Sequence, residues 1–304
     1  MAFMFNFSAE TADDKKEGVS DSNCPSVQVA DIKCDKTGNH HLTPASEVCV
    51  HKQSEIDKSI TVSSHKVGST ILKYLDPSDV EEQIRSRGDK EGAIIKAISA
   101  HSDLVAHVYE GGLKIWECSL DLIHYLQEVD IDFTNKKVLE LGCGAGLPGI
   151  FALKHGAENV TLQDYNEEVL EEMTVPNVLL NSPDDKGDIN GRCRFIAGDW
   201  SRLESFLKDH DITSKYDIIL TSETIYSIES QPVLHDVLKA LLSPGGTVYV
   251  AAKTHYFGVG GGTRMFEDLV KERGDFTINV CKEYKDGVQR EILKMKLTHE
   301  SDNR

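Results

Sequence analysis

Four closely spaced glycines directly after a short apolar run could bring backbone groups into contact with a ligand. The run Val138 to Leu141 is followed by Gly142, Gly144, Gly146 and Gly149. A turn that lacks Cβ atoms lets backbone N–H groups approach a ligand closely, and the start of the next helix adds a positive dipole end. These residues therefore predict a strand, a tight turn and a helix that together form a binding site.

A carboxylate follows this turn at an informative distance. The segment Asn159 to Gln163 is typical of the next parallel strand, and Asp164 stands at its C-terminal tip. In nucleotide-binding α/β folds, an acid about 20 residues after the glycines bonds the ribose hydroxyls. The two features together predict that the chain binds an adenosine-type cofactor.

The register of the glycines separates two classes of cofactor. Gly144 to Gly149 is a literal GxGxxG sequence, which is compatible with a dinucleotide and hence with an NAD-dependent dehydrogenase. The predicted strand ends at Leu141, so the first glycine of the turn is Gly142, and an acid, Glu140, precedes it by two residues. This register disfavours the dinucleotide hypothesis.

Strand and helix signals alternate along the chain and must position this turn. Predicted strands cover residues 137–141, 160–164, 193–197, 216–222, 246–252, 276–281 and 290–297, and predicted helices cover 147–155, 167–181, 201–209, 231–242 and 264–273. Alternating units of this kind form a parallel sheet wrapped by helices, and Asp286-Gly287 predicts a closing hairpin. We therefore expect an α/β, Rossmann-like fold with a seven-stranded, mostly parallel sheet and an antiparallel C-terminal hairpin.

The chain ahead of this sheet divides into two segments. Residues 1–65 are polar and lack sustained periodicity, so they cannot bury enough apolar surface to offset the entropy of ordering. We expect them to be largely disordered. Residues 66–130 form an N-terminal extension whose amphipathic helix, at 117–129, packs on the main domain at 131–300.

Composition restricts the partners that this chain can have. Its 304 residues carry 33 Lys and Arg against 50 Asp and Glu, which gives a formal net charge of −17. Such a chain repels phosphate backbones, so we expect a basic protein partner and no direct contact with nucleic acid. Seven cysteines without CxxC spacing argue against a metal site and favour a reducing compartment. Without an apolar run of ~20 residues or a signal peptide, we expect a cytoplasmic protein that does not contact membranes. We also expect it to be a monomer.

The pattern Glu140-x-Gly142-x-Gly144-x-Gly146 resembles motif I of the seven-strand methyltransferases that use S-adenosylmethionine. The closing hairpin is also similar to that family. The resemblance implies a class I methyltransferase domain with S-adenosylmethionine as cofactor. It further implies that Glu140 faces the methionine part of the cofactor and that Asp164 holds the ribose.

Several further stretches resemble one branch of that superfamily, the histidine protein methyltransferase family. They are residues 102–104, 108–118, 163–166, 176–178, 198–200, 220–226 and 255–262. Members of this family methylate the tele nitrogen of a histidine in a large-subunit ribosomal protein. The resemblance therefore implies that activity, a ribosomal-protein partner, and a location in the cytoplasm and the nucleus or nucleolus.

The resemblance also implies which residues contact the cofactor. The segment before motif I lies beside the cofactor, Tyr165 covers the adenine face, and Asp199 and Trp200 contact the adenine. Asn166 is expected to cap the helix that follows it. The full predicted set is Ile115, Trp116, Glu117, Cys118, Ser119, Glu140, Gly142, Gly144, Asp164, Tyr165, Asn166, Gly198, Asp199, Trp200 and Ser222.

The acceptor site is expected beyond the fourth predicted strand. Glu223 is the candidate for holding the substrate, since ligands bind at the carboxyl ends of strands in α/β sheets. A neutral imidazole is nucleophilic at cellular pH but needs a partner for the proton on its other nitrogen. Glu223 or Asp199 could supply that carboxylate, and His255 and Tyr256 are expected to line the acceptor pocket. Ser222 to Tyr226 also resembles the corresponding element of lysine-directed enzymes, so a lysine acceptor stays open, as does a non-catalytic cofactor-binding module.

Overall fold

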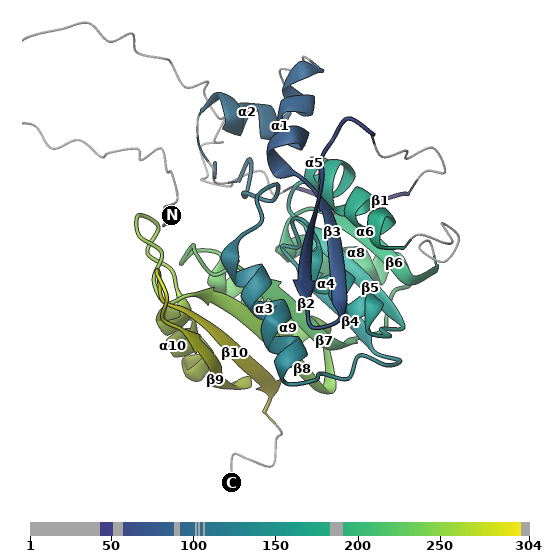
Figure 1. Ribbon diagram of the computed structural model, residues 1–304. Coiled ribbons are helices and arrows are strands. Elements are labelled where there is room, and N and C mark those ends of the chain that lie inside the picture. Colours follow the sequence, from purple (N-terminus) through teal and green to yellow (C-terminus); the bar gives the residue numbers. More distant parts are fainter. Residues whose placement is uncertain are drawn as a thin grey trace, which may run out of the picture.

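An eight-stranded mixed sheet forms the centre of the protein (Figure 1). The computed structural model describes residues 43–50, 57–87, 92–100, 102, 104–105, 107–182 and 191–298. The strands lie in the order β1-β6-β5-β4-β7-β8-β10-β9. The five central strands, β6, β5, β4, β7 and β8, are parallel to one another. The outer strands β1, β10 and β9 pair antiparallel with their neighbours. This arrangement confirms the predicted, mostly parallel sheet with an antiparallel C-terminal hairpin.

Seven strands of the sheet fall where the sequence predicts strands, with ends that differ by a few residues. They are β4 (Lys137–Leu141), β5 (Asn159–Asp164), β6 (Cys193–Ala197), β7 (Tyr216–Ser222), β8 (Leu242–Lys253), β9 (Phe276–Tyr284) and β10 (Arg290–Leu297). The eighth, β1, covers Ser46–Val48, and a separate hairpin pairs β2 (Val62–Val67) with β3 (Thr70–Leu75).

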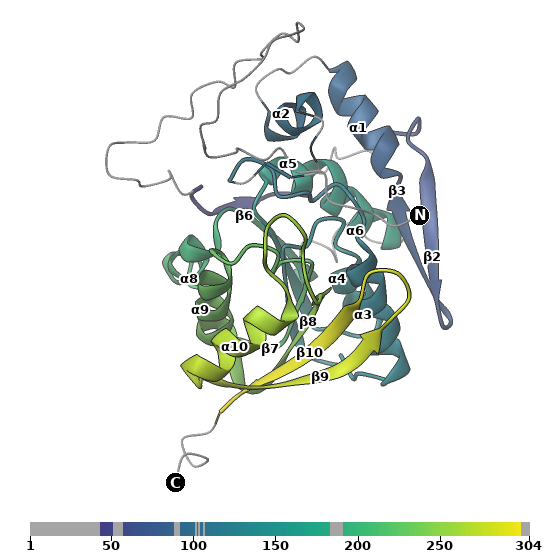
Figure 2. The ribbon, with the colours of Figure 1, turned by 90° about the vertical axis from the view of Figure 1, so that its left-hand side faces the viewer.

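Helices cover both faces of the sheet, as Figure 2 shows. One face carries α8 (Trp200–Asp209), α9 (Gln231–Leu241) and α10 (Thr263–Arg273). The other carries α3 (Glu117–Glu128), α4 (Leu147–Lys154), α6 (Val175–Asn181) and the β2–β3 hairpin, while α1 (Pro77–Ser86) and α2 (Ala93–Ser99) lie at its end. No helix among the described residues is long and apolar enough to cross a membrane.

The alternation of side chains along β4 explains how one strand serves two cores. Val138 packs into the core beneath α3 and α4, whereas Leu139 and Leu141 pack into the core beneath α8 and α9. Successive residues of a strand point to opposite faces of its sheet. The strand is therefore buried on both sides, and its carboxyl end is held where the glycine turn begins.

Strand β1 was not predicted from the sequence. It lies within the segment expected to be disordered and pairs antiparallel with the edge strand β6, with Glu47 opposite Ile196. Its three residues are too few to show an alternating pattern, and the exposed edge of β6 supplies the hydrogen-bonding partners. Residues 1–42 and 51–56 of the same segment lie outside the described residues.

The N-terminal extension is attached to the main domain by side-chain amides. The Leu75 N–H donates to Asn177 Oδ1 at 2.8 Å, and the Lys73 N–H donates to Asn181 Oδ1 at 3.0 Å. Both asparagines lie on α6, so strand β3 is bonded to this helix across more than 100 residues of sequence. The extension thereby fixes the position of α6 beside the glycine turn.

The helix predicted at residues 167–181 contains a wider turn in its middle. It consists of α5 (Glu167–Val169), a π-helical turn (Leu170–Thr174) and α6. Pro176 has no N–H, so the regular bond to the carbonyl four residues earlier cannot form. Single π turns of this kind are often found at functional sites, and this one directs Thr174 toward the glycine turn.

Candidate active site

A pocket opens at the carboxyl ends of β4, β5 and β7, the edge of the sheet at which α/β folds bind ligands. Its empty volume is about 1250 Å³, including the part that is open to solvent. The predicted site residues that line it are Ile115, Trp116, Ser119, Gly142, Gly144, Asp164, Tyr165, Gly198, Asp199, Trp200, Ser222 and Glu223. The structure therefore brings most of the predicted set together. Glu117, Cys118, Glu140, Asn166 and His255 are not among the lining residues.

The glycine turn forms one wall of bare backbone. A Cβ atom at Gly142 would lie 2.6 Å from Thr224 Cγ2, and one at Gly144 would lie 2.8 Å from the Gly112 carbonyl oxygen. Both glycines have positive φ angles, 61° and 49°, which other residues rarely adopt. The Gly144 N–H donates to Asp164 Oδ2 at 2.9 Å, so the turn is bonded to the end of β5.

Glu140 supports this turn from behind and does not face the pocket. Its side chain is buried, and its Oε2 accepts a hydrogen bond of 2.7 Å from the Gly149 N–H at the start of α4. Burial raises the pKa of Glu140 to about 8. The predicted contact with the methionine part of the cofactor is not matched by this position, because the strand alternation turns residue 140 toward the helix.

Asp164 lies where the sequence predicts the ribose-binding acid. The carboxylate lines the pocket, yet the residue is only 4% exposed. Its Oδ1 accepts a hydrogen bond of 3.1 Å from the Asn166 N–H, and Oδ2 accepts the bond from Gly144. Burial raises the pKa of Asp164 to about 6. A buried carboxylate at the tip of a strand is suited to bind a pair of hydroxyl groups.

Gln163 positions three parts of the cofactor site, although it is not one of the predicted site residues. Its Nε2 donates to the Gly198 carbonyl at 2.8 Å, and its Oε1 accepts from Trp200 Nε1 at 2.8 Å and from the Gly142 N–H at 3.3 Å. The local signal for it was its place directly before Asp164 at the end of β5. One amide thus fixes the indole of Trp200 and the glycine turn together.

Two residues predicted at the adenine side also hold the local structure. Asp199 lines the pocket, and its Oδ1 accepts a hydrogen bond of 2.8 Å from the Ser201 N–H, which caps α8. Tyr165 also lines the pocket, and its O–H donates to the His107 carbonyl at 3.0 Å. Asp199 is therefore engaged as a helix cap, which limits its use as the partner of an acceptor histidine.

Asn166 occupies the predicted cap position of α5, but its side chain makes no cap bond. Instead, Nδ2 donates to the Val108 carbonyl at 2.7 Å, and Oδ1 accepts from the Glu110 N–H at 3.2 Å. The capping prediction was wrong, because a distant chain segment competes for the amide. Asn166 ties the segment around residues 107–110 to the end of β5.

Trp116 presents a half-buried indole to the pocket. Its Nε1 donates to the Gly111 carbonyl at 3.0 Å, and two ammonium groups face its ring: Lys114 Nζ at 4.8 Å and Lys253 Nζ at 5.3 Å from the centroid. Cations at these distances are attracted to the face of an indole. This position agrees with the prediction that Trp116 lies beside the cofactor site.

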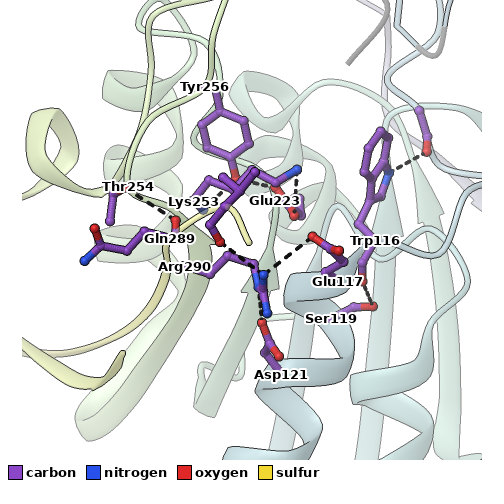
Figure 3. A network of polar contacts seen from close by, with 12 residues as sticks. Trp116, Glu117, Ser119, Asp121, Glu223, Lys253, Thr254, Tyr256, Gln289 and Arg290 are labelled. Atoms are coloured by element: carbon purple, nitrogen blue, oxygen red, sulfur yellow. Dashed lines mark hydrogen bonds and ion pairs between the residues drawn. The ribbon is translucent and has the colours of Figure 1, made fainter. Parts of the chain in front are cut away.

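The next two residues point away from the pocket. Glu117 lies 3.7 Å from Arg290 Nη1, and Arg290 Nε donates to Asp121 Oδ2 at 2.6 Å, so the start of α3 is fastened to β10 (Figure 3). Cys118 is fully buried, and burial raises the pKa of its thiol. Both are therefore supporting residues of the wall that Trp116 presents.

Glu223 sits at the end of β7 within a buried polar network (Figure 3). Tyr256 O–H donates to its Oε2, and Lys253 Nζ lies 3.4 Å from its Oε1. The side chains of Glu223 and Lys253 are each only 4% exposed. Glu223 also has a positive φ of 58°, a strained conformation that clusters at functional sites. The predicted carboxylate is present, but a cation already pairs with it.

A further pocket carboxylate, Glu110, is not one of the predicted site residues. Its Oε1 accepts a hydrogen bond of 2.8 Å from the His107 N–H, and its Oε2 accepts from Tyr226 O–H. Burial, together with the charges of Asp164 and Asp199, raises the pKa of Glu110 to about 7. No sequence pattern marks a contact between residues so far apart as Glu110 and Tyr226.

His255 is not part of this pocket. Its side chain is exposed, and its ring packs edge-on against Phe257 with 4.8 Å between centroids. The neighbouring Tyr256 is the residue of this loop that reaches the network, since it is buried and bonds Glu223. Of the two residues predicted to line the acceptor pocket, Tyr256 therefore reaches Glu223, whereas the prediction for His255 was wrong because its side chain is exposed.

The residues at hand fit S-adenosylmethionine. The glycine turn leaves no room for a Cβ atom, the buried Asp164 carboxylate stands at the tip of β5 where the resemblance places the ribose, and two aromatic residues, Tyr165 and Trp200, line the same pocket. The sheet topology and this site together define a class I methyltransferase, whose cofactor is S-adenosylmethionine.

Comparison with known proteins gives the family. A family model described as "Lysine methyltransferase" matches residues 100–267. The "Histidine protein methyltransferase 1 homolog" of Bos taurus is 44% identical over 279 residues, which covers 84% of this chain and 74% of the bovine protein. The protein of the same name from Dictyostelium discoideum is 48% identical over 196 residues, covering 64% of this chain and 60% of that protein. The chain belongs to the histidine protein methyltransferase family.

A solved structure shows a more distant likeness. The N-methyltransferase NodS from Bradyrhizobium japonicum, in complex with S-adenosyl-L-homocysteine, is 14% identical. It superimposes with a TM-score of 0.46, covering 62% of this chain and 91% of that chain.

Proposed function

We propose that this chain transfers a methyl group to the tele nitrogen of a histidine in a large-subunit ribosomal protein. Family membership supports the coarser part, S-adenosylmethionine-dependent methylation of histidine in a protein. The observation that carries the histidine acceptor is the 44% identity, over 84% of this chain, with a bovine protein named as a histidine protein methyltransferase homolog.

Charge supports a basic substrate. The pocket is lined by several carboxylates, with Glu110, Asp199 and Glu229 among them, and the whole chain has a net charge of −17. Complementary charge speeds the encounter of partners and fixes their register. A ribosomal protein, which must itself bind polyanionic RNA, has the complementary sign.

The pocket residues supply positioning and exclusion of water. When bound, S-adenosylmethionine supplies the methyl group as a sulfonium electrophile. Asp164 and the glycine turn hold the cofactor in place, and Trp116 closes one side of the pocket. We propose that Glu223, held by Lys253 and Tyr256, contacts the incoming substrate, and that the exposed His255 contacts the substrate outside the pocket. Fixing two reactants in line accounts for most of the rate in such a transfer.

A lysine acceptor is the second candidate, because the matching family model is described as "Lysine methyltransferase". The two acceptors differ in their pH dependence. A lysine ammonium, with a pKa near ~10.4, must lose a proton first, so activity would rise about tenfold per pH unit up to pH ~9. A histidine acceptor, with a pKa near ~6.5, gives activity that levels off above pH ~7.

The proposed function also concerns the oligomeric state of the enzyme, its cellular compartment and its partners. We propose that the enzyme works as a monomer in the cytoplasm and the nucleus or nucleolus, where ribosomal proteins are made and assembled. Its partner is then a basic protein, with no direct contact to nucleic acid or membrane.

Labelling of a cell extract tests the substrate. The protein is incubated with radiolabelled S-adenosylmethionine and either intact ribosomes or free ribosomal proteins, and the labelled band is identified by mass spectrometry. We expect label in one basic large-subunit protein and none with Asp164→Ala, which should also lose cofactor binding in calorimetry. Label confined to other proteins contradicts the substrate. Cofactor binding without any labelled product favours the non-catalytic module.

A further inference from the structure

The pocket contains a carboxylate that the roles above leave unused. We infer that Glu110 is a catalytic residue that accepts the hydrogen bond, and then the proton, of the pros nitrogen of the acceptor imidazole. The inference rests on the proposed function, because an imidazole presents a second nitrogen and a lysine does not.

The placement of Glu110 joins the cofactor side of the pocket to the acceptor side. Its backbone N–H donates to Asn166 Oδ1 at 3.2 Å, which anchors it beside the end of β5. Its carboxylate meets Tyr226 O–H, which comes from the loop after β7. Ser227 and Ser230 of the same loop also line the pocket. A substrate side chain entering past this loop therefore meets the Glu110 carboxylate.

The charges around Glu110 differ from those around Glu223. No lysine or arginine in the described parts of the chain forms an ion pair with Glu110, and the nearest charges that act on it, Asp164 and Asp199, have the same sign. Glu223 in contrast pairs with Lys253 at 3.4 Å. Like charges and burial favour the protonated form of a carboxyl group. The pKa of Glu110, about 7, suits a proton acceptor at neutral pH.

The chemical step balances with Glu110 in this role. The lone pair of the tele nitrogen forms the new N–C bond as the S–C bond breaks, and the electrons of that bond stay on sulfur. The positive charge passes to the imidazole ring, where the pros N–H donates to Glu110. The proton then moves to the Glu110 carboxylate, which leaves a neutral tele-methylhistidine, and is released to water. The same hydrogen bond fixes the tautomer beforehand, as in other carboxylate–histidine pairs.

Glu110→Gln tests this assignment, because glutamine keeps the size and the bond from His107 but cannot take a proton. With a histidine peptide, we expect kcat to fall by about 10²-fold or more, while cofactor affinity measured by calorimetry stays within about threefold. Wild-type kcat should fall below pH 7 as Glu110 becomes protonated, with a limb near its pKa of about 7. Glu110→Gln should keep only the fall caused by protonation of the acceptor histidine, near its pKa of ~6.5, and Glu110→Asp should restore part of the rate.

Two controls show whether the effect belongs to the Glu110 carboxyl itself. Glu204→Gln removes an exposed charge that pairs with Lys208 on α8 and should leave kcat unchanged. In the wild-type protein, carbon NMR of the Glu110 carboxyl should give a pKa near 7, and a value near the ordinary ~4.3 overturns the inference even if the variant fails to fold. A Glu110→Gln enzyme with kcat within about threefold of wild type, or with lost cofactor binding, also overturns it. Failure of the wild type to label histidine refutes the proposed function instead.

Discussion

Glu140 and Glu223 are both acids at strand ends, yet their surroundings give them different roles. Glu140 is turned beneath α4, where it accepts a hydrogen bond from Gly149 and meets no cation in the described ion pairs. Glu223 points to the pocket and is matched by Lys253 and Tyr256. Residue type and spacing made both residues candidates for the site. Only their contacts in the folded protein show that Glu140 supports the glycine turn and that Glu223 lines the pocket.

Glu140→Gln should make the stability of the ligand-free protein less dependent on pH. Burial raises the pKa of Glu140 from 4.5 to about 8, so its contribution to stability is full below pH ~4.5 and is lost as the pH rises through about 8. Glutamine keeps the bond from Gly149 without a charge. Urea unfolding should therefore show the variant more stable than wild type at pH ~8, with a difference that shrinks toward pH ~5. A role in cofactor contact predicts more than tenfold weaker binding in calorimetry and no gain in stability.

Lys253→Met should destabilise the protein by about 3–5 kcal/mol, because it leaves the Glu223 carboxylate buried without its cation. Urea denaturation at pH ~7 measures the change. The double variant Lys253→Met with Glu223→Gln should recover much of the loss, since the uncompensated charge is gone. A loss below about 1 kcal/mol in the single variant would show that the pair is far more hydrated than its 4% exposure indicates.

Among the helices and strands, the π-helical turn and α6 hold the glycine turn from outside the pocket. Thr174 O–H donates to the Gly144 carbonyl, and Asn177 Nδ2 donates to the Ala145 carbonyl at 2.9 Å. The same Asn177 accepts the bond from Leu75 in the N-terminal hairpin. The cofactor turn, the helix and the hairpin are thus joined through one amide.

Asn177→Leu should cost roughly 2–5 kcal/mol of stability, since it leaves the Leu75 N–H and the Ala145 carbonyl buried without their partners. Cofactor affinity should fall as well, because the turn loses a support. Urea unfolding and calorimetry measure the two effects. Asn279→Leu is the matched control on the exposed side of β9 and should change neither. If the Asn177→Leu variant is destabilised but binds the cofactor with unaltered affinity, the glycine turn keeps its conformation without Asn177.

Across the whole molecule, local sequence patterns predict the sheet well and the contacts between distant segments poorly. The seven strands β4 to β10 and the cofactor wall around Gly142 and Asp164 follow from periodicity, glycine spacing and family resemblance. Strand β1 is too short to show a pattern. The contact of Glu110 with Tyr226 and the pair of Glu223 with Lys253 join distant segments, and no local signal encodes such contacts. Sequence therefore predicted the fold and the cofactor side better than the acceptor side.

The net charge of the whole molecule predicts how KM for the protein substrate depends on ionic strength. With a net charge of −17 and acids around the pocket, KM for a basic protein substrate should rise several-fold between about 50 mM and about 300 mM salt, while kcat stays nearly constant. Steady-state kinetics at a series of salt concentrations checks this, with KM for the cofactor as the internal control. A KM for the protein substrate that is independent of salt would contradict charge-based recognition.

The identity of the methylated atom decides whether this enzyme is directed to the tele nitrogen of histidine. The protein is incubated with labelled S-adenosylmethionine and ribosomal proteins, the product is hydrolysed to amino acids, and the label is separated against tele-methylhistidine, pros-methylhistidine and methyl-lysine standards. We predict label in tele-methylhistidine. Label in methyl-lysine or in pros-methylhistidine would contradict the proposed function.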